Sequence, residues 1–302
     1  MTTDQPCLVI VCGPTAVGKT RAAITLAKEL NCEIISADAR QFYSELKIGT
    51  APPSSSELKQ IRHHLIGHLS VKDPYNIGIY EKDALLILDR LFRSSRFAVV
   101  VGGSGLYLHA LCHGLDLLPE HDQQVREEIN RLFQSSGVTA LQEKLKVLDH
   151  DYYEKVDLSN PARLIRAIEV SLISGKPYSS FRKQAPQTRP FRIIKTGLDL
   201  PREELYRRID RRVDEMIWNG LLEEARSMLP FRSFNALNTV GYKEFFEYFD
   251  GKLSLEEAII LIKQHTRNYA KRQLTWFRRD NEITWFHPED VSGILKLVTR
   301  HS

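Results

Sequence analysis

The sequence predicts an α/β fold, in which a parallel sheet core is covered by helices and carries an inserted all-helical subdomain. Over the first 110 residues, short apolar runs typical of buried strands alternate with helical patterns, which favours a parallel sheet. From about residue 119 to 175 the apolar spacing is wholly helical, and a strand-like run follows at 191–198. A glycine-rich loop after the first strand makes this a P-loop-type core. We therefore expect three segments: 1–118 as the first part of the core, 119–190 as the insertion, and 191–302 as the return to the core with C-terminal helices.

The expected elements follow one another along the chain. Apolar runs predict strands at 7–13, 33–37, 64–69 and 97–102, and helical spacing predicts helices at 21–30, 76–92 and 106–112. In the insertion, Val125, Ile129 and Leu132 share one helical face, and a second helical repeat covers 163–172. Three prolines in 175–190 predict a loop. Helices dominate after the strand at 191–198, apart from a last apolar stretch at 283–286.

The composition is that of an ordinary soluble enzyme and excludes a membrane-spanning protein. Hydrophobic residues make up 42% of the chain, and no apolar run approaches the ~18 residues that a membrane-spanning helix requires. The N-terminus is too polar for a signal peptide, so we expect a cytoplasmic location. The cysteines lack the spacing of a zinc site, so we expect reduced and mostly buried thiols at Cys7, Cys12, Cys32 and Cys112.

The most informative motif is a full match to G-x-x-x-x-G-K-[ST], which we call the phosphate loop: Gly13, Pro14, Thr15, Ala16, Val17, Gly18, Lys19 and Thr20. Its glycines let backbone N–H groups surround an anion. Lys19 adds a mobile positive charge, and the Thr20 hydroxyl suits Mg²⁺. A glycine-rich turn without a ligand is the alternative, but a full match between a strand and a helix predicts phosphate binding.

The neighbouring strand lacks the acidic residue that a nucleotide hydrolase or kinase of this class normally carries. The strand at 97–101 runs directly into Gly102-Gly103-Ser104-Gly105, with no carboxylate at its end. Asp89 lies in a helical pattern and ends no strand. These observations disfavour a standard ATPase. A small-molecule kinase and a nonenzymatic RNA-binding module stay open as alternatives.

Four groups of polar residues are candidates for the rest of a site. Asp38 follows the second strand beside the phosphate loop, where it suits a general base or a simple turn cap. The turn at 102–105 offers backbone amides and the Ser104 hydroxyl, with an ordinary tight turn as the alternative. Two groups are arginines, for which surface ion pairs are the alternative: Arg163 with Arg166, and Arg207, Arg208, Arg211 and Arg212.

Positive charge is concentrated near the C-terminus. The net charge of +4, from 42 Lys and Arg against 38 Asp and Glu, does not indicate nucleic-acid binding by itself. Residues 258–279 contain no acidic side chain, and Lys263, Arg267 and Lys271 recur every four residues. On a helix these three residues form one row, which we call the basic stripe. The stripe is either a polyanion-binding surface or a solvated face.

Together these residues resemble the tRNA dimethylallyltransferase family, also called tRNA isopentenyltransferases. The resemblance covers nearly the whole chain through ten stretches in order: GPTAVGKT, ISADARQFY, IGTAPP, HHLIGH, VGGSGLYL, NPARLIRAIEV, SGKP, RIDRRVDEM, TVGYKE and YAKRQLTWFRR. It implies transfer of a dimethylallyl group from dimethylallyl diphosphate to N6 of the adenosine 3′-adjacent to the anticodon. Transfer from a prenyl diphosphate needs no activated water. The resemblance therefore also accounts for the absence of a carboxylate after residue 101.

The resemblance implies roles for individual residues. Asp38 corresponds to the aspartate that accepts the N6 proton, and Arg212 to the arginine that stabilises the diphosphate. Lys19 and a Mg²⁺ ion at Thr20 would add positive charge, with residues 13–20 as the donor site. Contacts to the tRNA anticodon stem-loop, with the target adenosine flipped out, are implied for Asp38, Ala39, Arg40, Gln41, Ser104, Arg126, Ala162, Arg163, Leu164, Ile165, Arg166, Gly241, Tyr242, Lys243, Lys271, Arg272 and Arg278.

Four residues depart from the family pattern. Ser104 stands where threonine is usual, Ala39 replaces a common serine, and Gly67-His68 replaces Asp-Ile. None of these changes removes a group expected to act in catalysis. The resemblance is to the bacterial form, for which we expect no zinc-finger extension, and we expect a monomer. Which tRNAs are substrates, how strictly the five-carbon donor is preferred and whether nucleotides compete for the phosphate loop stay open.

Overall fold

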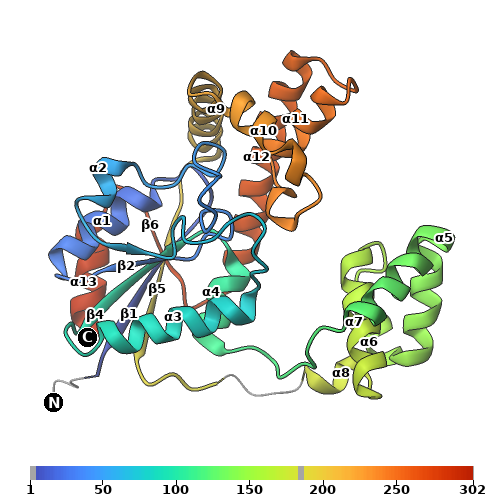
Figure 1. The fold of residues 1–302 in the computed structure, drawn as a ribbon. Helices are drawn as coiled ribbons and strands as arrows, with labels where there is room; N and C mark the ends of the chain where they lie inside the picture. Colours follow the sequence, from blue (N-terminus) through green and yellow to red (C-terminus); the bar gives the residue numbers. More distant parts are fainter. Residues whose placement is uncertain (1–4, 183–186, 302) are drawn as a thin grey trace. The chain divides into compact units, whose positions relative to one another are not determined.

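The computed structural model describes residues 5–182 and 187–301, and the chain divides into two compact units. Residues 1–113 and 188–302 form one unit, which we call the core unit. Residues 114–187 form the other, which we call the inserted unit. The chain therefore leaves the core unit once and returns to it once, as the colours of Figure 1 show.

The core unit is built on a six-stranded sheet whose strands all run parallel. The strands are β1 Cys7–Cys12, β2 Ile34–Ser36, β3 His63–His64, β4 Phe97–Gly102, β5 Arg192–Leu198 and β6 Thr284–Phe286. Their order is β3-β2-β4-β1-β5-β6, so Val9 of β1 lies opposite both Val99 and Ile194. Burial on both faces explains the unbroken apolar runs of β1 and β4. The predicted parallel sheet is confirmed.

Helices cover both faces of this sheet (Figure 1). On one face, α1 Lys19–Glu29, α9 Arg202–Trp218 and α13 Val291–His301 pack against Val9 and Val11. On the other face, α3 Ile77–Leu91 and α4 Gly105–His113 pack against Leu8 and Ile10. Successive residues of a strand point to opposite faces, so each central strand contributes to two hydrophobic cores.

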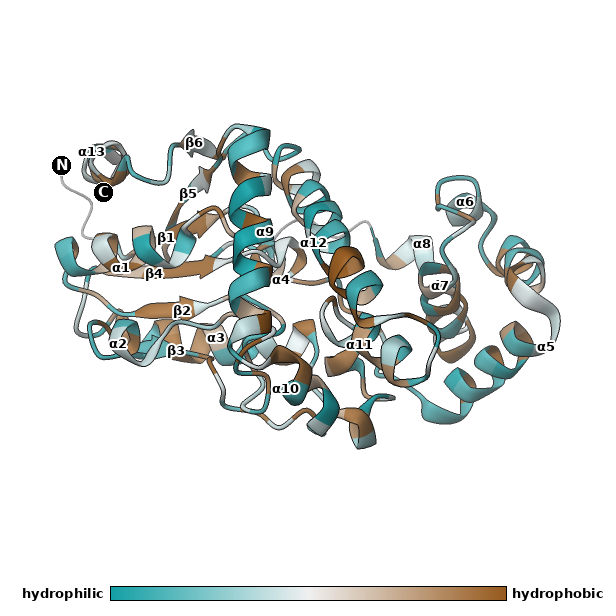
Figure 2. Ribbon diagram, turned by 90° about the horizontal axis from the view of Figure 1, so that it is seen from above, coloured by the Kyte–Doolittle hydropathy of each residue, from teal (hydrophilic) through white to brown (hydrophobic). Residues whose placement is uncertain are grey.

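A third hydrophobic cluster joins the remaining helices of the core unit. It contains residues of α9, α10 Leu221–Ser227, η2 Asn235–Leu237, α11 Tyr242–Phe249 and α12 Leu255–Phe277, with η1 Leu229–Phe231 packed alongside. Leu46 and Val71, from the loops after β2 and β3, belong to the same cluster. Figure 2 shows β2 and β4 in brown and much of α9 in teal, so the apolar residues of α9 are confined to its packed face. The short helix α2 covers Ser55–Leu58.

The inserted unit is helical and has its own hydrophobic core. Its helices are α5 Gln123–Leu148, α6 His150–Tyr153, α7 Pro161–Ser174 and α8 Tyr178–Phe181. Ile129 and Leu141 of α5 pack with Leu164 and Ile168 of α7. Gly137 interrupts α5, because its backbone angles of φ 72° and ψ −167° are not helical.

Two local predictions were wrong. The strand expected at 64–69 is only the two-residue β3, because Leu65 (φ 59°) and Gly67 (φ 55°) adopt left-handed backbone conformations that end the pairing. Leu69 makes an isolated bridge to Tyr43 instead. The loop expected at 175–190 contains the one-turn helix α8, and residues 183–186 of that prediction lie outside the described residues.

All four cysteines are buried thiols, as expected. Burial raises the pKa of Cys7 to about 11 and the pKa of Cys12, Cys32 and Cys112 to about 12. Within the described part of the chain, no helix is long and apolar enough to cross a membrane.

The end of β4 approaches the segment after β2 so closely that only glycine fits. A Cβ on Gly102 would lie 2.2 Å from the carbonyl oxygen of Ala37. The Ala37 N–H donates to the Val101 carbonyl at 2.7 Å, and the Ser104 N–H donates back to the Ala37 carbonyl at 3.3 Å. This contact fixes the backbone directly before Asp38.

We expect Gly102→Ala to lower the free energy of unfolding by about 3 kcal/mol, the upper end of overpacking costs, because the opposing atom is backbone and cannot rotate away. The control is Gly251→Ala, which has φ 73° and no atom within 4 Å of the added Cβ. We expect it to cost only about 1 kcal/mol, for the left-handed conformation. Urea unfolding of both variants measures the difference, and equal losses would mean that the strands separate easily at Gly102.

Candidate active site

The phosphate loop connects β1 to α1 through a backbone with several left-handed residues. Gly13 has φ 144°, Ala16 has φ 64° and Gly18 has φ 108°. A Cβ on Gly13 would lie 2.6 Å from the carbonyl oxygen of Leu198 in β5, so this position also requires glycine. Alternation of left-handed and ordinary residues turns backbone N–H groups to one side, and such an arrangement at the N-terminus of a helix is suited to an anion.

The Lys19 side chain is held against the backbone of the phosphate loop. Its Nζ donates to the Pro14 carbonyl at 2.7 Å. Burial lowers the pKa of Lys19 to about 8, the Asp38 carboxylate opposes this shift, and Arg212 adds to it. A bound polyanion would raise this pKa again, because nearby negative charge favours the protonated ammonium group.

Two arginines of α9 reach the phosphate loop. Arg212 Nη1 donates to the Thr15 hydroxyl at 3.3 Å, and Arg208 Nη1 lies 3.5 Å from the Val17 carbonyl oxygen. Burial lowers the pKa of Arg212, and Asp38 is the leading influence in the opposite direction. In the predicted arginine group of α9, Arg208 also pairs with Glu204 and Arg211 pairs with Glu215, each at 2.8 Å, and Arg207 is exposed. Lys19, Arg208 and Arg212 therefore surround the loop with positive charge.

Asp38 lies two residues beyond β2, at the same edge of the sheet as the phosphate loop. Its Oδ1 accepts a hydrogen bond from the Arg40 N–H at 3.0 Å, which fixes the carboxylate plane. Within residues 5–182 and 187–301, its other oxygen, Oδ2, accepts no hydrogen bond. Asp38 is also the leading opposite charge for both Lys19 and Arg212. This arrangement leaves one carboxylate oxygen available as a proton acceptor.

Ser104 supports the segment that carries Asp38. Its hydroxyl accepts a hydrogen bond from the Ala39 N–H at 3.0 Å. Tyr269 of α12 lines the same cavity as Asp38, and burial and then the Asp38 charge raise the pKa of Tyr269. In the sequence, Tyr269 stands between Arg267 and Lys271 of the basic stripe, and nothing there connects it to Asp38. Its position beside Asp38 depends on the packing of α12 and could not be predicted.

Gln273 is a second residue that sequence reasoning missed. Its buried side-chain amide accepts a hydrogen bond from the Thr15 N–H at 2.9 Å and donates to the Gly103 carbonyl at 2.8 Å. One amide thus connects the phosphate loop to the glycine-rich turn after β4. The available signal was its place in the motif YAKRQLTWFRR, where a glutamine interrupts basic and aromatic residues.

Two cavities meet at these residues. The smaller has a volume of about 420 Å³ and is lined by Lys19, Thr20 and the arginines of α9. The larger has a volume of about 640 Å³ and is lined by residues of α11 and α12, including Lys243, Tyr269 and Arg272. Five residues line both cavities: Thr15, Asp38, Thr50, Ala51 and Arg212. The candidate catalytic residues therefore form a wall that two compartments share.

Several predicted RNA contacts of the core unit are used to hold loops in place. The Arg40 guanidinium donates to the carbonyls of Asn235 and Asn238 at 2.9 and 3.3 Å. Arg278 pairs with Asp199 at 2.7 Å. Gly241, Lys243 and Arg272 do line the larger cavity, and the Lys271 side chain is exposed.

Tyr242 requires a correction. It is completely buried, and its hydroxyl donates to Glu224 at 2.6 Å. Burial first, and then the Glu224 carboxylate, raise its pKa. Its side chain therefore holds α11 against its neighbours, and a direct contact with RNA is excluded in this structure.

In the inserted unit, some of the predicted RNA-contact residues are buried or ion-paired and others are exposed. Leu164 and Ile165 are core residues of α7, so their side chains stabilise that helix and do not face a ligand. Arg126 and Arg166 donate to the fully buried Glu169 at 3.1 and 3.0 Å, and His121 contacts the same carboxylate. Arg163 and Ala162 are exposed.

The basic stripe does not present three free cations. Lys263 pairs with Asp214 and Arg267 with Asp210, each at 2.6 Å, and both acidic residues belong to α9. The segment 258–279 contains no acidic residue, but a neighbouring helix supplies the missing charges. Of the three stripe residues, Lys271 remains exposed.

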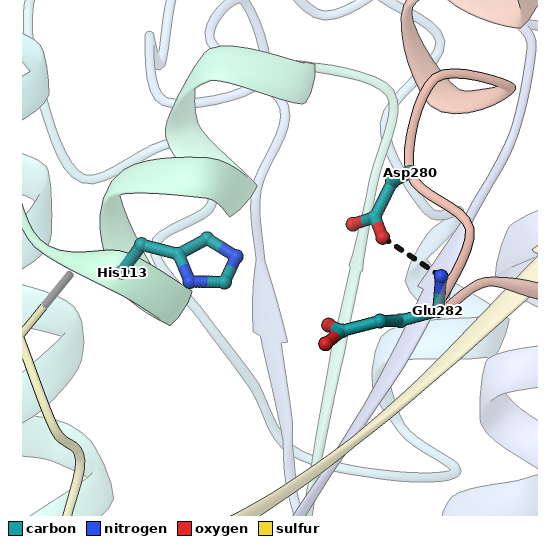
Figure 3. Close-up of side chains that lie close together, drawn as sticks. All are labelled: His113, Asp280 and Glu282. Carbon is teal, nitrogen blue, oxygen red and sulfur yellow. Dashed lines mark hydrogen bonds between the residues drawn. The ribbon is translucent and has the colours of Figure 1, made fainter.

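A group of potential metal ligands lies elsewhere in the core unit. His113 at the end of α4 and Asp280 and Glu282 after α12 point toward one another, with ligand atoms within 4.8 Å (Figure 3). Lys195 of β5 already lies among them, with Nζ 2.8 Å from Asp280, 2.7 Å from Glu282 and 3.1 Å from His113. Although burial opposes it, the hydrogen bonds to Asp280 and Glu282 raise the Lys195 pKa. The ammonium group therefore takes the place of a metal ion.

Known proteins resemble this chain in both sequence and fold. The family profile described as IPP transferase matches residues 41–280. A tRNA dimethylallyltransferase of Christiangramia forsetii is 52% identical over 285 residues, which is 94% of each chain. The tRNA dimethylallyltransferase 1 of Bacteroides thetaiotaomicron is 48% identical over 294 residues, covering 97% of this chain and 96% of the relative.

Two solved structures agree. The full-length tRNA isopentenylpyrophosphate transferase of Bacillus halodurans has a TM-score of 0.72 and 35% identity, covering 98% of this chain and 96% of its own. A eukaryotic dimethylallyltransferase described as acting on tRNA has a TM-score of 0.77 and 26% identity, covering 95% of this chain and 75% of its own. The profile covers most of the chain and the relatives nearly all of it, so this chain belongs to the IPP transferase family, that of the tRNA dimethylallyltransferases.

Proposed function

We propose that this protein transfers the dimethylallyl group of dimethylallyl diphosphate to N6 of the adenosine 3′-adjacent to the anticodon of tRNA, with release of diphosphate. The observation that carries this proposal is the wall shared by the two cavities, which contains Thr15, Asp38 and Arg212. A donor in the smaller cavity and an acceptor in the larger cavity would react across it. Relatives named tRNA dimethylallyltransferase support the same reaction.

The smaller cavity suits the prenyl diphosphate. Negative charge develops on the leaving diphosphate as the C–O bond breaks, and fixed cations stabilise that charge without reorganisation. Lys19, Arg208 and Arg212 converge on the phosphate loop from two sides. Backbone N–H groups of the loop would bind the remaining phosphate oxygens.

The same cavity suits Mg²⁺, which prefers oxygen ligands and keeps part of its water shell. Oxygen-bearing side chains that line it include Ser36 and Glu57 as well as Thr20. Thr20 lies in the first turn of α1, where a side-chain hydroxyl can hold the ion beside bound phosphates. When bound, Mg²⁺ would neutralise part of the charge of the leaving group.

Asp38 has the geometry of the proton acceptor. The amine nitrogen N6 forms a bond to the allylic carbon while the bond from that carbon to the diphosphate oxygen breaks. The surplus proton of the amine then passes to Oδ2 of Asp38, because Oδ1 is engaged by the Arg40 N–H. The adenosine must leave its stack to reach this oxygen, and the larger cavity of about 640 Å³ has room for a base.

The proposed RNA contacts are those whose side chains are free to make them. Lys243 and Arg272 would act in the larger cavity, Lys271 on the surface of α12, and Arg163 on the inserted unit. Arg126 and Arg166 keep contact with Glu169, so each contributes only part of its charge.

The decisive test is incubation with dimethylallyl diphosphate, Mg²⁺ and unmodified tRNA, followed by mass analysis of the nucleosides. We expect N6-isopentenyladenosine at the position after the anticodon and an equal amount of free diphosphate. Formation of ADP from ATP without a prenyl donor would indicate a kinase instead. Binding of tRNA without any modification would indicate an RNA-binding module.

We expect Asp38→Asn to lower kcat by about 100- to 10,000-fold, which is the usual loss when a general base is removed. Asparagine keeps an oxygen for the Arg40 N–H, so the turn should survive. Affinity for tRNA and for inorganic diphosphate should change by less than about threefold, as filter binding and inhibition measurements would show. A variant with wild-type kcat would remove Asp38 from the mechanism.

The lowered pKa of Lys19 predicts the pH dependence of donor binding. With a pKa of about 8 in the empty site, Lys19 loses its charge as the pH rises above that value, so donor affinity should fall. We expect the donor KM to rise by up to about tenfold for each pH unit above 8, since only the charged form binds well. In Lys19→Arg the guanidinium stays protonated, so the KM should be nearly constant between pH 7.5 and 9.5. Parallel profiles for both proteins would assign the titration to another group.

A further inference from the structure

Glu224, in the first turn of α10, accepts four hydrogen bonds from distant parts of the core unit. Its Oε2 accepts from the backbone N–H groups of Lys47 and Ile48, both at 2.8 Å. Its Oε1 accepts from the Gly49 N–H at 2.9 Å and from the Tyr242 hydroxyl at 2.6 Å. Four donors on two oxygens use the full acceptor capacity of the carboxylate. One side chain of α10 therefore fixes three consecutive backbone N–H groups, those of residues 47, 48 and 49.

The loop that Glu224 holds, residues 47–51, is strained, and we call it the wall loop. Ala51 has φ 43°, a left-handed conformation that residues other than glycine rarely adopt. On the far side of the loop, the Gln41 amide donates to the carbonyls of Thr50 and Ala51 at 3.2 and 3.1 Å. Strained backbone persists only where the surroundings fix it, and it is concentrated at functional sites. Glu224 and Gln41 hold the wall loop from its two ends.

The wall loop lies where the two cavities meet. Thr50 and Ala51 line both cavities, and Gly49 lines the larger one. A Cβ on Gly49 would lie 2.6 Å from the hydroxyl oxygen of Tyr242, so the loop also packs tightly on α11. Glu224 itself lines neither of these two cavities. Its action on the site therefore passes through the wall loop.

We propose that Glu224 is a positioning residue, which aligns donor and acceptor by fixing the wall loop between them. The proposal rests on the proposed function, since it assigns the two cavities to the two substrates. Small displacements matter for such a reaction, because a misplacement of about 1 Å between reacting groups can cost about 100-fold in rate. Binding of the diphosphate depends on the phosphate loop, which Glu224 does not contact.

The test compares Glu224→Gln with Glu223→Gln. The glutamine amide presents its NH2 group to two of the four donors in either orientation. The Tyr242 hydroxyl can accept from that group but a backbone N–H cannot, so at least one backbone hydrogen bond is lost. Glu223 is exposed and lies in the same first turn of α10, so its variant removes the same charge near the helix N-terminus. We expect kcat to fall by about 10- to 100-fold in Glu224→Gln and by less than twofold in Glu223→Gln. The inhibition constant of inorganic diphosphate should stay within twofold in both.

Hydrogen exchange of the protein without substrates separates this proposal from the proposed function. We expect the amides of residues 47 and 48, or that of residue 49, to exchange at least tenfold faster in Glu224→Gln than in the wild type or in Glu223→Gln, according to which side the glutamine NH2 group faces. Failure of the wild type to prenylate tRNA would overturn the proposed function. The exchange result would then still test whether Glu224 holds the wall loop. Unchanged exchange together with a kcat within twofold of the wild type would overturn the role of Glu224.

Two further variants keep the test decisive if Glu224→Gln does not fold. Tyr242→Phe removes one donor and leaves the three backbone contacts, so kcat should fall by less than tenfold. Glu224→Asp keeps the charge on a shorter side chain. Its kcat should lie between those of the wild type and Glu224→Gln. If Glu224→Gln does not fold, the expected loss of kcat in Glu224→Asp is up to about 100-fold relative to the wild type. Wild-type kcat in both variants would overturn the proposal, as would losses that disappear once the folded fraction is taken into account.

Discussion

The parallel register of β1, β2 and β4 is the constraint on which the candidate active site depends. Cys12 pairs with Gly102, and Ser36 pairs with Val101, so the three strands end at one edge of the sheet. The phosphate loop, Asp38 and the glycine-rich turn begin there within a few residues of one another. Parallel strands place their carboxyl ends together, and ligands of open α/β sheets bind at that edge. The missing side chain of Gly102 allows the strands to approach closely enough.

The sheet edge alone does not make the site, because its cations and its second compartment come from helices late in the chain. Arg212 arrives on α9, and Gln273 on α12 bonds to Thr15 across 258 positions of sequence. The third hydrophobic cluster holds these helices against each other, and Glu224 connects the same cluster to the wall loop. Packing of apolar residues thus sets the positions of polar groups that never share a sequence motif.

Sequence reasoning succeeded where the determinants are local. The phosphate loop follows from eight adjacent residues, and the location of Asp38 follows from its place after a strand. It failed where partners are remote: the spacing of Lys263 and Arg267 gave their helix face correctly, but not their pairing with Asp214 and Asp210 of α9. Tyr242 stood in a recognisable motif, yet its side chain is buried. Glu224 and Gln273 gave little signal, because their hydrogen-bonding partners lie far away in sequence.

Cys12 stands directly before the phosphate loop, and its burial has a chemical consequence. Oxidants and alkylating reagents attack the thiolate, and a pKa of about 12 leaves almost none of it at neutral pH. The other three thiols are protected by burial in the same way. The phosphate loop thus has as its neighbour a sulfur atom that is buried and almost wholly protonated, and cysteine-directed reagents should react with it only slowly.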